Sequence, residues 1–445
     1  MNRLFGTDGI RAVAGKYPLD YSTAYLIGKN LTDLLKKENL SPHILIGRDT
    51  RLSGEWLQKA LFQGIRDSGG EAVSAGVIPT SAIAVLSKIK SFSSGIVISA
   101  SHNPYEYNGI KIFSSEGIKI KDSFERKLEN LIIKPGKKII PDSSDPIPSK
   151  ELKTEYVEFL KSKFCYKNFS KGIKIVVDCA NGASSNIAPD VFSDLGFDTL
   201  PINDRPDGTN INSNCGSLFP NTLASKVLET KADLGVAFDG DSDRAIFVDE
   251  KGKVLNGDHT LFILSKYMKE KGSLKSDKII GTIMSNLGLE KALKQIGLRL
   301  IRTNVGDRYV YEEMLKQNSN LGGEQSGHTI ILNECPTGDG ILTSLKVIQA
   351  MAPKDRPLSS LSSGFHEYPQ IQKNVKISRR EEFENCPGIM KAIQKAEEAL
   401  MEKGRVKVRY SGTEPVARVM IEGENKEKIE RLGQMIAESI SKELA

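Results

Sequence analysis

Segments with the character of buried β-strands alternate with segments of helical periodicity along most of this chain, and this alternation constrains the fold more than any other feature. Early in the sequence, strand patterns at residues 44–46, 72–77 and 95–99 are separated by helical patterns at 53–65 and 81–87. Strands that alternate with helices pack in layers, with the helices against the faces of a sheet. The sequence therefore predicts an α/β fold.

The length of the chain predicts several domains. A domain averages about 150 residues, so a chain of 445 residues is too long for one core and predicts three or four. A connector rich in proline, serine and aspartate at 134–150 and a serine-glycine linker at 359–364 mark two boundaries, and a strand pattern at 172–178 opens a new unit. We expect four domains, at residues 1–150, 151–254, 255–366 and 367–445.

Two serines and a histidine follow the strand pattern at 95–99 directly. The chain reads Ser99-Ala100-Ser101-His102-Asn103-Pro104, and proline at 104 ends regular structure. A serine where a strand gives way to a loop presents its hydroxyl near backbone N–H groups, which suits a nucleophile or a covalent group carrier. A serine-rich turn is the structural alternative.

Three carboxylates at alternate positions follow a second apolar strand pattern, at 232–238. They are Asp239, Asp241 and Asp243, and a further strand pattern begins at residue 245. Carboxylates this close repel one another unless a cation lies among them, and oxygen ligands favour Mg²⁺ or Ca²⁺. The spacing approaches that of a calcium-binding EF-hand loop, but Arg244 stands where that loop needs glycine and both flanks are strands, so we reject that motif. The pattern favours a magnesium site over a solvated acidic turn.

A loop with arginines and hydroxyl groups lies near the C-terminus. The run Arg409-Tyr410-Ser411-Gly412-Thr413-Glu414-Pro415 separates two strand patterns, and Arg418 follows. The planar guanidinium group matches phosphate oxygens with paired hydrogen bonds, and a glycine lets the backbone approach closely. Taken alone, a phosphate cradle and an ordinary β-turn with solvated arginines explain this loop equally well.

Together these segments resemble the α-D-phosphohexomutase superfamily. Each matching piece is modest alone, but seven of them occur in the right order along the whole chain, which makes the resemblance specific. The pieces are residues 5–11, 99–104, 108–111, 239–244, 304–310, 322–328 and 409–415.

The resemblance implies a fold and a place for each motif. Members of the superfamily have three similar α/β mixed-sheet domains and a smaller α+β C-terminal domain around a central cleft. The phosphoserine loop would then lie in domain 1–150 and the metal loop in 151–254. The sugar loop would lie in 255–366 and the phosphate loop in 367–445.

The resemblance also implies a reaction. Hexose phosphomutases carry a phosphoserine that donates its phosphoryl group to a sugar monophosphate, and the sugar 1,6-bisphosphate intermediate turns around and returns its other phosphate. The carrier matches Ser101, with Ser99 as the competing assignment. A single Mg²⁺ would be bound by Asp239, Asp241, Asp243 and an oxygen of the phosphoserine at Ser101.

Further site residues follow from the same matched pieces. Arg11 and Lys111 match positions close to the phosphoserine. Lys111 is the better candidate for carrying a proton, because lysine shifts its pKa more readily than arginine, and charge pairing with phosphate is its alternative role. His102 is either a base or, as we favour, a residue that orders the loop. Arg244 would contact phosphate or sugar, or pair with a neighbouring aspartate.

Two loops would bind the rest of the substrate. Glu324 and Ser326 match the loop that binds adjacent sugar hydroxyls. The residues that match the loop for the non-reacting phosphate are Arg409, Ser411, Gly412, Thr413 and Arg418. Because this loop fixes either end of the substrate, both orientations can react.

The sugar is the least constrained part of the prediction. Glucosamine, glucose and mannose phosphates differ at C2, and one contact can decide among them. Residues 304–310 and the Glu-Gln-Ser form of the sugar loop resemble members that interconvert glucosamine 6-phosphate and glucosamine 1-phosphate, which feeds UDP-N-acetylglucosamine and peptidoglycan synthesis. An isomerase of mannose or glucose phosphates and a non-catalytic sugar-phosphate-binding protein are the alternatives.

Composition argues against several other classes of protein. Lysine and arginine number 62 against 56 acidic residues, a net charge of +6 that suits a small anionic substrate but falls short of a nucleic-acid-binding surface. Five cysteines are scattered without metal-ligand spacing, which predicts free thiols in a reducing compartment. Neither a signal region nor a membrane-spanning apolar run is present in the sequence. We expect a cytoplasmic isomerase with no nucleic-acid or membrane partner, and an oligomer is compatible with the sequence.

Overall fold

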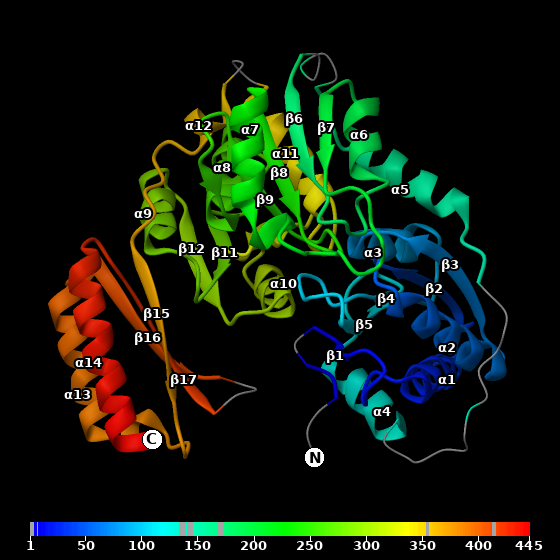
Figure 1. Ribbon diagram of the computed structural model, residues 1–445, viewed down its shortest axis with the longest axis horizontal. Helices are drawn as coiled ribbons and strands as arrows, with labels where there is room; N and C mark the ends of the chain where they lie inside the picture. The colour runs from blue at the N-terminus through cyan, green and yellow to red at the C-terminus, as the bar shows by residue number, and fades with distance from the viewer. Residues whose placement is uncertain are drawn as a thin grey trace. The chain divides into compact units, whose positions relative to one another are not determined.

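The structure is a computed structural model that describes residues 4–6, 8–132, 139, 146–166, 169, 172–352, 356–411 and 415–445. The chain divides into two compact units. The N-terminal unit comprises Met1–Met284 and Ile301–Ser363, and the C-terminal unit comprises Ser285–Leu300 and Gly364–Ala445. Figure 1 shows the elements of both units, coloured along the chain.

The first sheet is mixed and has the strand order β1-β5-β4-β2-β3. Strands β4, β2 and β3 are parallel, whereas β5 is antiparallel to β4 and β1. The strands are β1 (Ile10–Val13), β2 (His43–Arg48), β3 (Glu71–Val77), β4 (Ser94–Ile98) and β5 (Tyr107–Ser114). The helices are α1 (Tyr21–Lys37), α2 (Ser53–Asp67), α3 (Thr80–Ile89) and α4 (Asp122–Ile132).

Both faces of this sheet are covered. Right-handed connections between parallel strands place α2 and α3 on opposite faces (Figure 1). Alternate strand residues such as Ile44, Ile46, Ile96 and Ile98 form one core with the apolar side of α1, α2 and α4. The buried strands that the apolar runs predicted are therefore confirmed for this part of the chain.

The second sheet repeats the plan of the first. Its strand order is β10-β9-β8-β6-β7, with β8, β6 and β7 parallel and β9 antiparallel to β8 and β10. The strands are β6 (Lys174–Asp178), β7 (Asp198–Ile202), β8 (Leu234–Phe238), β9 (Ala245–Asp249) and β10 (Val254–Leu255). The helices are α5 (Lys150–Ser162), α6 (Ala188–Asp194), α7 (Pro220–Thr230) and the 3₁₀ turn η1 (Gly216–Leu218).

The third sheet has the order β12-β11-β13-β14, in which β11 and β13 are parallel and β14 is antiparallel to β13. The strands are β11 (Lys278–Thr282), β12 (Arg299–Thr303), β13 (Leu321–Gly323) and β14 (Thr329–Ile331). The helices are α8 (Gly257–Glu270), α10 (Asp307–Lys316), α11 (Gly340–Met351) and α12 (Leu358–Leu361). Short helix α12 overlaps the first part of the predicted linker 359–364. Leu358 and Leu361, three residues apart, are both buried and hold this turn of helix against the unit.

One topological position recurs in these three sheets. In each, the strand at one end of the parallel part is joined by a hairpin loop to an antiparallel neighbour. These loops are residues 99–106 after β4, 239–244 after β8 and 324–328 after β13. They coincide with the serine, acidic and sugar-loop motifs, so equivalent places in three sheets carry the predicted chemistry.

The C-terminal unit has a different plan. Its antiparallel sheet has the order β15-β17-β16, formed by β15 (Gln370–Lys376), β16 (Gly404–Tyr410) and β17 (Val416–Gly423). Its helices are α9 (Leu287–Gln295), α13 (Pro387–Leu400), α14 (Lys426–Leu444) and the 3₁₀ turns η2 (Phe383–Asn385) and η3 (Met401–Lys403). Helices α13 and α14 pack with the sheet in one apolar core. Three α/β mixed sheets and a smaller α+β part confirm the predicted fold class.

Among the described residues, no helix combines the length and the hydropathy that a membrane span requires.

Candidate active site

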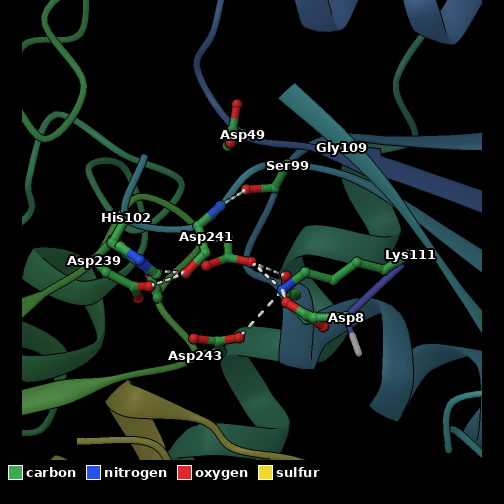
Figure 2. Close-up of polar contacts among 12 residues, drawn as sticks. Asp8, Asp49, Ser99, His102, Gly109, Lys111, Asp239, Asp241 and Asp243 are labelled. Carbon is green, nitrogen blue, oxygen red and sulfur yellow. Dashed lines mark hydrogen bonds and ion pairs between the residues drawn. The ribbon is translucent and has the colours of Figure 1, made fainter. Parts of the chain in front are cut away.

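Ser101 lies in the β4–β5 loop in a left-handed backbone conformation, with a φ of 53°. Its hydroxyl donates a hydrogen bond to Oδ2 of Asp239 at 2.5 Å, and Nδ1 of His102 lies 3.3 Å from the same hydroxyl. The hydroxyl of Ser99 is used differently, because it accepts a hydrogen bond from the Ser101 N–H at 2.9 Å (Figure 2). This geometry favours Ser101 over Ser99 as the group carrier.

The three aspartates of the β8–β9 loop come together. Asp239, Asp241 and Asp243 are all buried, and each offers an oxygen within 4.8 Å of the others. The loop turns at Ser242, whose φ is 60°. Figure 2 shows Asp241 and Asp243 joined to the side chain of Lys111, with Asp239 beside His102.

This carboxylate cluster fits a divalent cation. Burial raises the pKa of Asp239 well above its usual range, and the charges of Asp243 and Asp241 act in the same direction. The Oδ1 atoms of Asp241 and Asp243 are buried without a hydrogen-bonding partner among the residues that the structure describes. Buried carboxylate oxygens normally have partners, so these two atoms are candidate ligands for Mg²⁺.

Lys111 brings a positive charge into the same cluster. Its Nζ lies 2.9 Å from Oδ2 of Asp241, 3.3 Å from Oδ2 of Asp243 and 3.2 Å from Oδ2 of Asp8. Burial lowers the pKa of this ammonium group, but the three carboxylates outweigh burial and raise the pKa well above its usual value. Lys111 is therefore charged in this arrangement, as the charge-pairing alternative requires.

Asp8 connects three cations, and sequence reasoning missed it although it lies in the matched piece 5–11. Its carboxylate forms ion pairs with Arg11, Lys111 and Lys119. Burial raises the pKa of Asp8, but these cations outweigh burial and hold the pKa well below its usual range. Lys119 also pairs with Asp307 at the start of α10, and no sequence spacing marks Lys119.

His102 is partly buried beside Ser101. Burial lowers the pKa of its imidazole to about 3, and the charges of Arg244 and Arg11 act in the same direction. The ring is therefore neutral near pH 7 in this arrangement. A neutral ring next to the serine hydroxyl suits either role that the sequence left open for His102.

Arg244 follows the carboxylate loop directly. Its Nε lies 3.9 Å from Oδ2 of Asp239 and 3.9 Å from Oδ1 of Asp243. Its backbone N–H donates a hydrogen bond to Oδ1 of Asp239 at 3.2 Å. Arg244 thus makes the ion pairs given as the structural alternative, and its side chain keeps 17% of its surface exposed for a ligand.

Two of the matched pieces, residues 304–310 and 322–328, contact each other beside the third sheet. Oε1 of Glu324, in the β13–β14 loop, accepts a hydrogen bond from the N–H of Gly306 at 2.8 Å. Gly306 precedes α10 with a φ of 132°, which an L side chain rarely adopts. Ser326 is exposed in the same loop as Glu324. Their contact with a sugar stays a prediction.

In the C-terminal unit, Arg409 of β16 and Arg418 of β17 stand directly opposite each other. Burial lowers the pKa of Arg409, and the charge of Arg418 adds to this shift. Like charges at opposed positions destabilise a sheet, which favours an anion as their partner. Nη2 of Arg418 donates to Oγ of Ser411 at 3.4 Å. Gly412 and Thr413, predicted for the same loop, lie outside the described residues.

Three further polar side chains contact the serine and carboxylate loops, and sequence reasoning missed all of them. Thr80 donates to Oδ2 of Asp241 at 2.6 Å. Arg51 and Asn212 donate to the carbonyl oxygen of Ser101, at 3.1 and 2.9 Å. These three residues lie far along the sequence from the residues that they contact, so no local motif predicts them. Folding alone brings them to the site.

A cavity of about 570 Å³ lies beside this network, between the start of α4 and one face of α10. Lys119, Asp307 and Arg308 are among its lining residues, whereas Ser101 and the three aspartates are not. The candidate site is therefore identified by its reactive groups and not by this cavity.

Family models and relatives identify the family of this chain. Phosphoglucomutase/phosphomannomutase α/β/α domains I, II and III match residues 2–138, 154–252 and 256–368, and the C-terminal domain matches residues 373–439. The phosphoglucosamine mutases of Caldicellulosiruptor saccharolyticus and Syntrophus aciditrophicus are 46% and 45% identical to this chain, each over 100% of both sequences. The chain belongs to the phosphoglucosamine mutase family. Members of this family are isomerases that act as phosphohexomutases.

Solved structures share the fold of the phosphoglucosamine mutase family at lower identity. A phosphoglucomutase/phosphomannomutase family protein of Burkholderia thailandensis has a TM-score of 0.79 at 22% identity and covers 99% of this chain and 97% of its own. The N-acetylphosphoglucosamine mutase of Aspergillus fumigatus, solved with GlcNAc-6P and magnesium, has a TM-score of 0.68 at 17% identity. It covers 99% of this chain and 95% of its own.

Proposed function

We propose that this protein interconverts glucosamine 6-phosphate and glucosamine 1-phosphate through a phosphoserine at Ser101 and glucosamine 1,6-bisphosphate. The observation that carries the proposal is the 2.5 Å hydrogen bond from the Ser101 hydroxyl to Asp239, which puts a nucleophilic oxygen at the edge of a cation site. The choice of glucosamine follows the names of relatives that are about 45% identical over the full chain.

The reaction consists of two transfers in opposite directions. In the first, the bond from phosphorus to Oγ of Ser101 breaks, a bond from phosphorus to O1 of glucosamine 6-phosphate forms, and the O1 hydroxyl gives its proton to a base, for which the neutral ring of His102 is the candidate. After the bisphosphate has turned around, the bond from phosphorus to O6 breaks, the bond from phosphorus to Oγ of Ser101 forms again, and O6 takes up a proton. Phosphoryl transfer of this kind depends on in-line positioning and on neutralised charge more than on covalent work by the protein.

Charge neutralisation is assigned to two groups of residues. Asp239, Asp241, Asp243 and an oxygen of the phosphoserine would hold Mg²⁺, which when bound withdraws charge from the phosphoryl group. The ammonium group of Lys111 lies beside the same carboxylates and supplies a second positive charge. Its charged state suits pairing with a phosphate oxygen, and donation of a proton to the departing sugar oxygen is the proton-transfer role open to it.

Substrate binding is assigned to the remaining predicted residues. Arg11 and Arg244 would contact the reacting phosphate, and Glu324 and Ser326 the sugar hydroxyls. The set assigned to the non-reacting phosphate is Arg409, Ser411, Gly412, Thr413 and Arg418. Glucosamine 1,6-bisphosphate would also load the serine, as an activator. A cytoplasmic location accords with these small, charged substrates.

A coupled assay with the three sugar phosphates tests the proposal. We expect turnover of glucosamine phosphate to exceed that of glucose and mannose phosphates in kcat/KM by at least about 100-fold, because one polar contact at C2 decides the choice. Equal or faster turnover of the neutral sugars would identify a phosphoglucomutase or phosphomannomutase. If magnesium-loaded, phosphorylated protein turned over none of the three sugars, the catalytic proposal would be wrong.

A further inference from the structure

The backbone on both sides of His102 is held by two side chains from distant parts of the chain. Nη2 of Arg51 donates to the carbonyl oxygen of Ser101 at 3.1 Å and to that of Asn103 at 2.5 Å. Nδ2 of Asn212 donates to the same two oxygens, at 2.9 and 3.1 Å. We propose that Arg51 and Asn212 are positioning residues that clamp this loop and keep the Ser101 hydroxyl aligned for phosphoryl transfer. The inference rests on the proposed role of Ser101 as carrier.

The burial of Arg51 restricts its side chain to contacts inside the protein, including the carbonyl oxygens of Ser101 and Asn103. Its side chain is 0% exposed and forms an ion pair with Asp49, whose side chain is also 0% exposed. Asp49 is itself fixed, because its N–H donates to the carbonyl oxygen of Ile98 at 3.1 Å and its Oδ1 accepts from the N–H of Arg51 at 3.0 Å. A buried guanidinium group is costly unless its charge and its N–H groups are satisfied. Since Arg51 has no exposed surface, it acts on a substrate through the loop.

Asn212 comes from the segment that follows β7 in the second sheet. Its backbone is also left-handed, with a φ of 58°, and its N–H donates to the carbonyl oxygen of Ala180 at 2.9 Å. Gly240 of the carboxylate loop packs against the same place. A Cβ atom at Gly240 would lie 2.6 Å from the carbonyl oxygen of Ser101 and 2.8 Å from Nδ2 of Asn212. The serine loop, Asn212 and the carboxylate loop therefore meet at one carbonyl group.

The conformation of Ser101 needs such support. A φ of 53° is unfavourable for a residue with a side chain, and conformations of this kind persist where the surroundings impose them. The N–H of Ser101 is held by Oγ of Ser99, and its carbonyl oxygen is held by Arg51 and Asn212. Both peptide groups that flank the Ser101 side chain are thus fixed, which sets the direction of its Cα–Cβ bond, and the hydrogen bond to Asp239 orients the hydroxyl.

A carrier that serves both ends of a sugar depends on this precision of placement. Oγ of Ser101 has to meet O1 in one transfer and O6 in the other along the same line. A displacement of about 1 Å costs on the order of 100-fold in rate. Loss of the clamp therefore lowers kcat, whereas KM changes little, since neither Arg51 nor Asn212 belongs to the residues proposed to bind sugar or phosphate.

The substitution Asn212→Asp tests the clamp, with Asn320→Asp as a matched control. In Asn212→Asp, the donor nitrogen becomes a carboxylate oxygen that faces two carbonyl oxygens. Asn320 is 0% exposed, its Nδ2 donates to the carbonyl oxygen of Ser273 at 2.9 Å, and it precedes β13 at the end opposite the β13–β14 loop. Both variants are loaded with magnesium and glucosamine 1,6-bisphosphate, and kcat, KM and the phosphoserine fraction by intact mass are measured for the full-length protein.

The clamp predicts a fall in kcat of at least tenfold for Asn212→Asp, with KM and the phosphoserine fraction within twofold of the wild type. Asn320→Asp keeps kcat within twofold. An unchanged kcat, an equal loss in both variants, or a rise in KM alone would overturn the clamp while the wild type stays active. A wild type without mutase turnover would instead refute the proposed function, and the clamp with it.

Arg51→Lys provides the second variant if Asn212→Asp does not fold. Lysine keeps the charge opposite Asp49 but lacks the planar fork that reaches two carbonyl oxygens and a carboxylate at once. We expect the result predicted for Asn212→Asp: kcat falls at least tenfold while KM stays nearly constant. A normal kcat for folded Arg51→Lys would contradict the clamp.

Discussion

The β4–β5 loop and the β8–β9 loop occupy the same position in two sheets of the same plan, yet they carry opposite chemistry. The first presents the hydroxyl of Ser101 to Asp239, and the second presents three carboxylates. Each also contains a left-handed serine, Ser101 with a φ of 53° and Ser242 with a φ of 60°. The topology thus fixes where each loop lies and how sharply it turns, while the side chains in the loop decide what it can do.

The two loops differ in how their polar groups are satisfied. The backbone groups of Ser101 all bind side chains, from Ser99, Arg51 and Asn212. Asp241 and Asp243 instead each keep a buried oxygen that accepts no hydrogen bond in the described part of the chain. The backbone of Ser101 thus has its hydrogen bonds within the protein, whereas the aspartate loop leaves oxygens that could bind a cation.

Removing the hydroxyl of the first loop should have the largest effect. We expect Ser101→Ala to lower kcat by about 10⁴-fold or more, because the covalent carrier is lost. Ser99→Ala, which removes one hydrogen bond to the Ser101 N–H, should cost about tenfold or less. Initial rates and the phosphate content by intact mass distinguish the two. A Ser101→Ala protein that stays phosphorylated and active would move the carrier role to another residue.

Neutralising one carboxylate of the second loop should have the next largest effect. We expect Asp241→Asn to lower kcat by about 100-fold or more, because it removes a proposed metal ligand and a partner of Lys111. Asp249→Asn, a buried aspartate at the end of β9 outside the cluster, is the matched control. Calorimetric titration with Mg²⁺ should show weakened binding for the first variant alone. Equal magnesium affinity in both variants would argue against the predicted ligand set.

A substitution that forces the two loops apart should lower the free energy of unfolding. In Gly240→Ala the new Cβ would lie 2.6 Å from the carbonyl oxygen of Ser101, so one loop must shift. Overpacking of this kind costs about 1–3 kcal/mol, which urea unfolding would measure. Gly6→Ala, whose Cβ would find its nearest contact at 3.5 Å, serves as the control for the same change. An unaltered midpoint for Gly240→Ala would show that the loops do not meet this closely.

The β16–β17 hairpin of the C-terminal unit carries the arginine pair and is a fourth loop to compare. Substitution of one of these arginines should have the smallest effect. Arg409 and Arg418 are opposed like charges, so Arg409→Met should stabilise the anion-free protein by about 0.2–1 kcal/mol. Added inorganic phosphate should raise the thermal midpoint of the wild type more than that of the variant. Identical shifts for both proteins would exclude this arginine as a phosphate contact.

Much of the site was predictable because its reactive groups lie in short motifs next to recognisable strands. Ser101 and the aspartates follow apolar runs that form β4 and β8. The supporting residues left no such signal. Asn212 lies 111 residues from Ser101, and Lys119 lies 188 residues from its partner Asp307. Pairs this far apart along the chain meet through packing, which no local pattern encodes.

The sequence by itself determined the alternation of strands and helices, the loops that carry a hydroxyl, three carboxylates and an arginine pair, and the family to which the chain is similar. These features depend on local periodicity and on residue chemistry. The tertiary structure decided which serine faces the carboxylates, where the ammonium group of Lys111 lies, and which buried groups hold the serine backbone. These positions depend on the register between antiparallel strands and on burial. Both are defined only in the folded protein, after the sheets have formed.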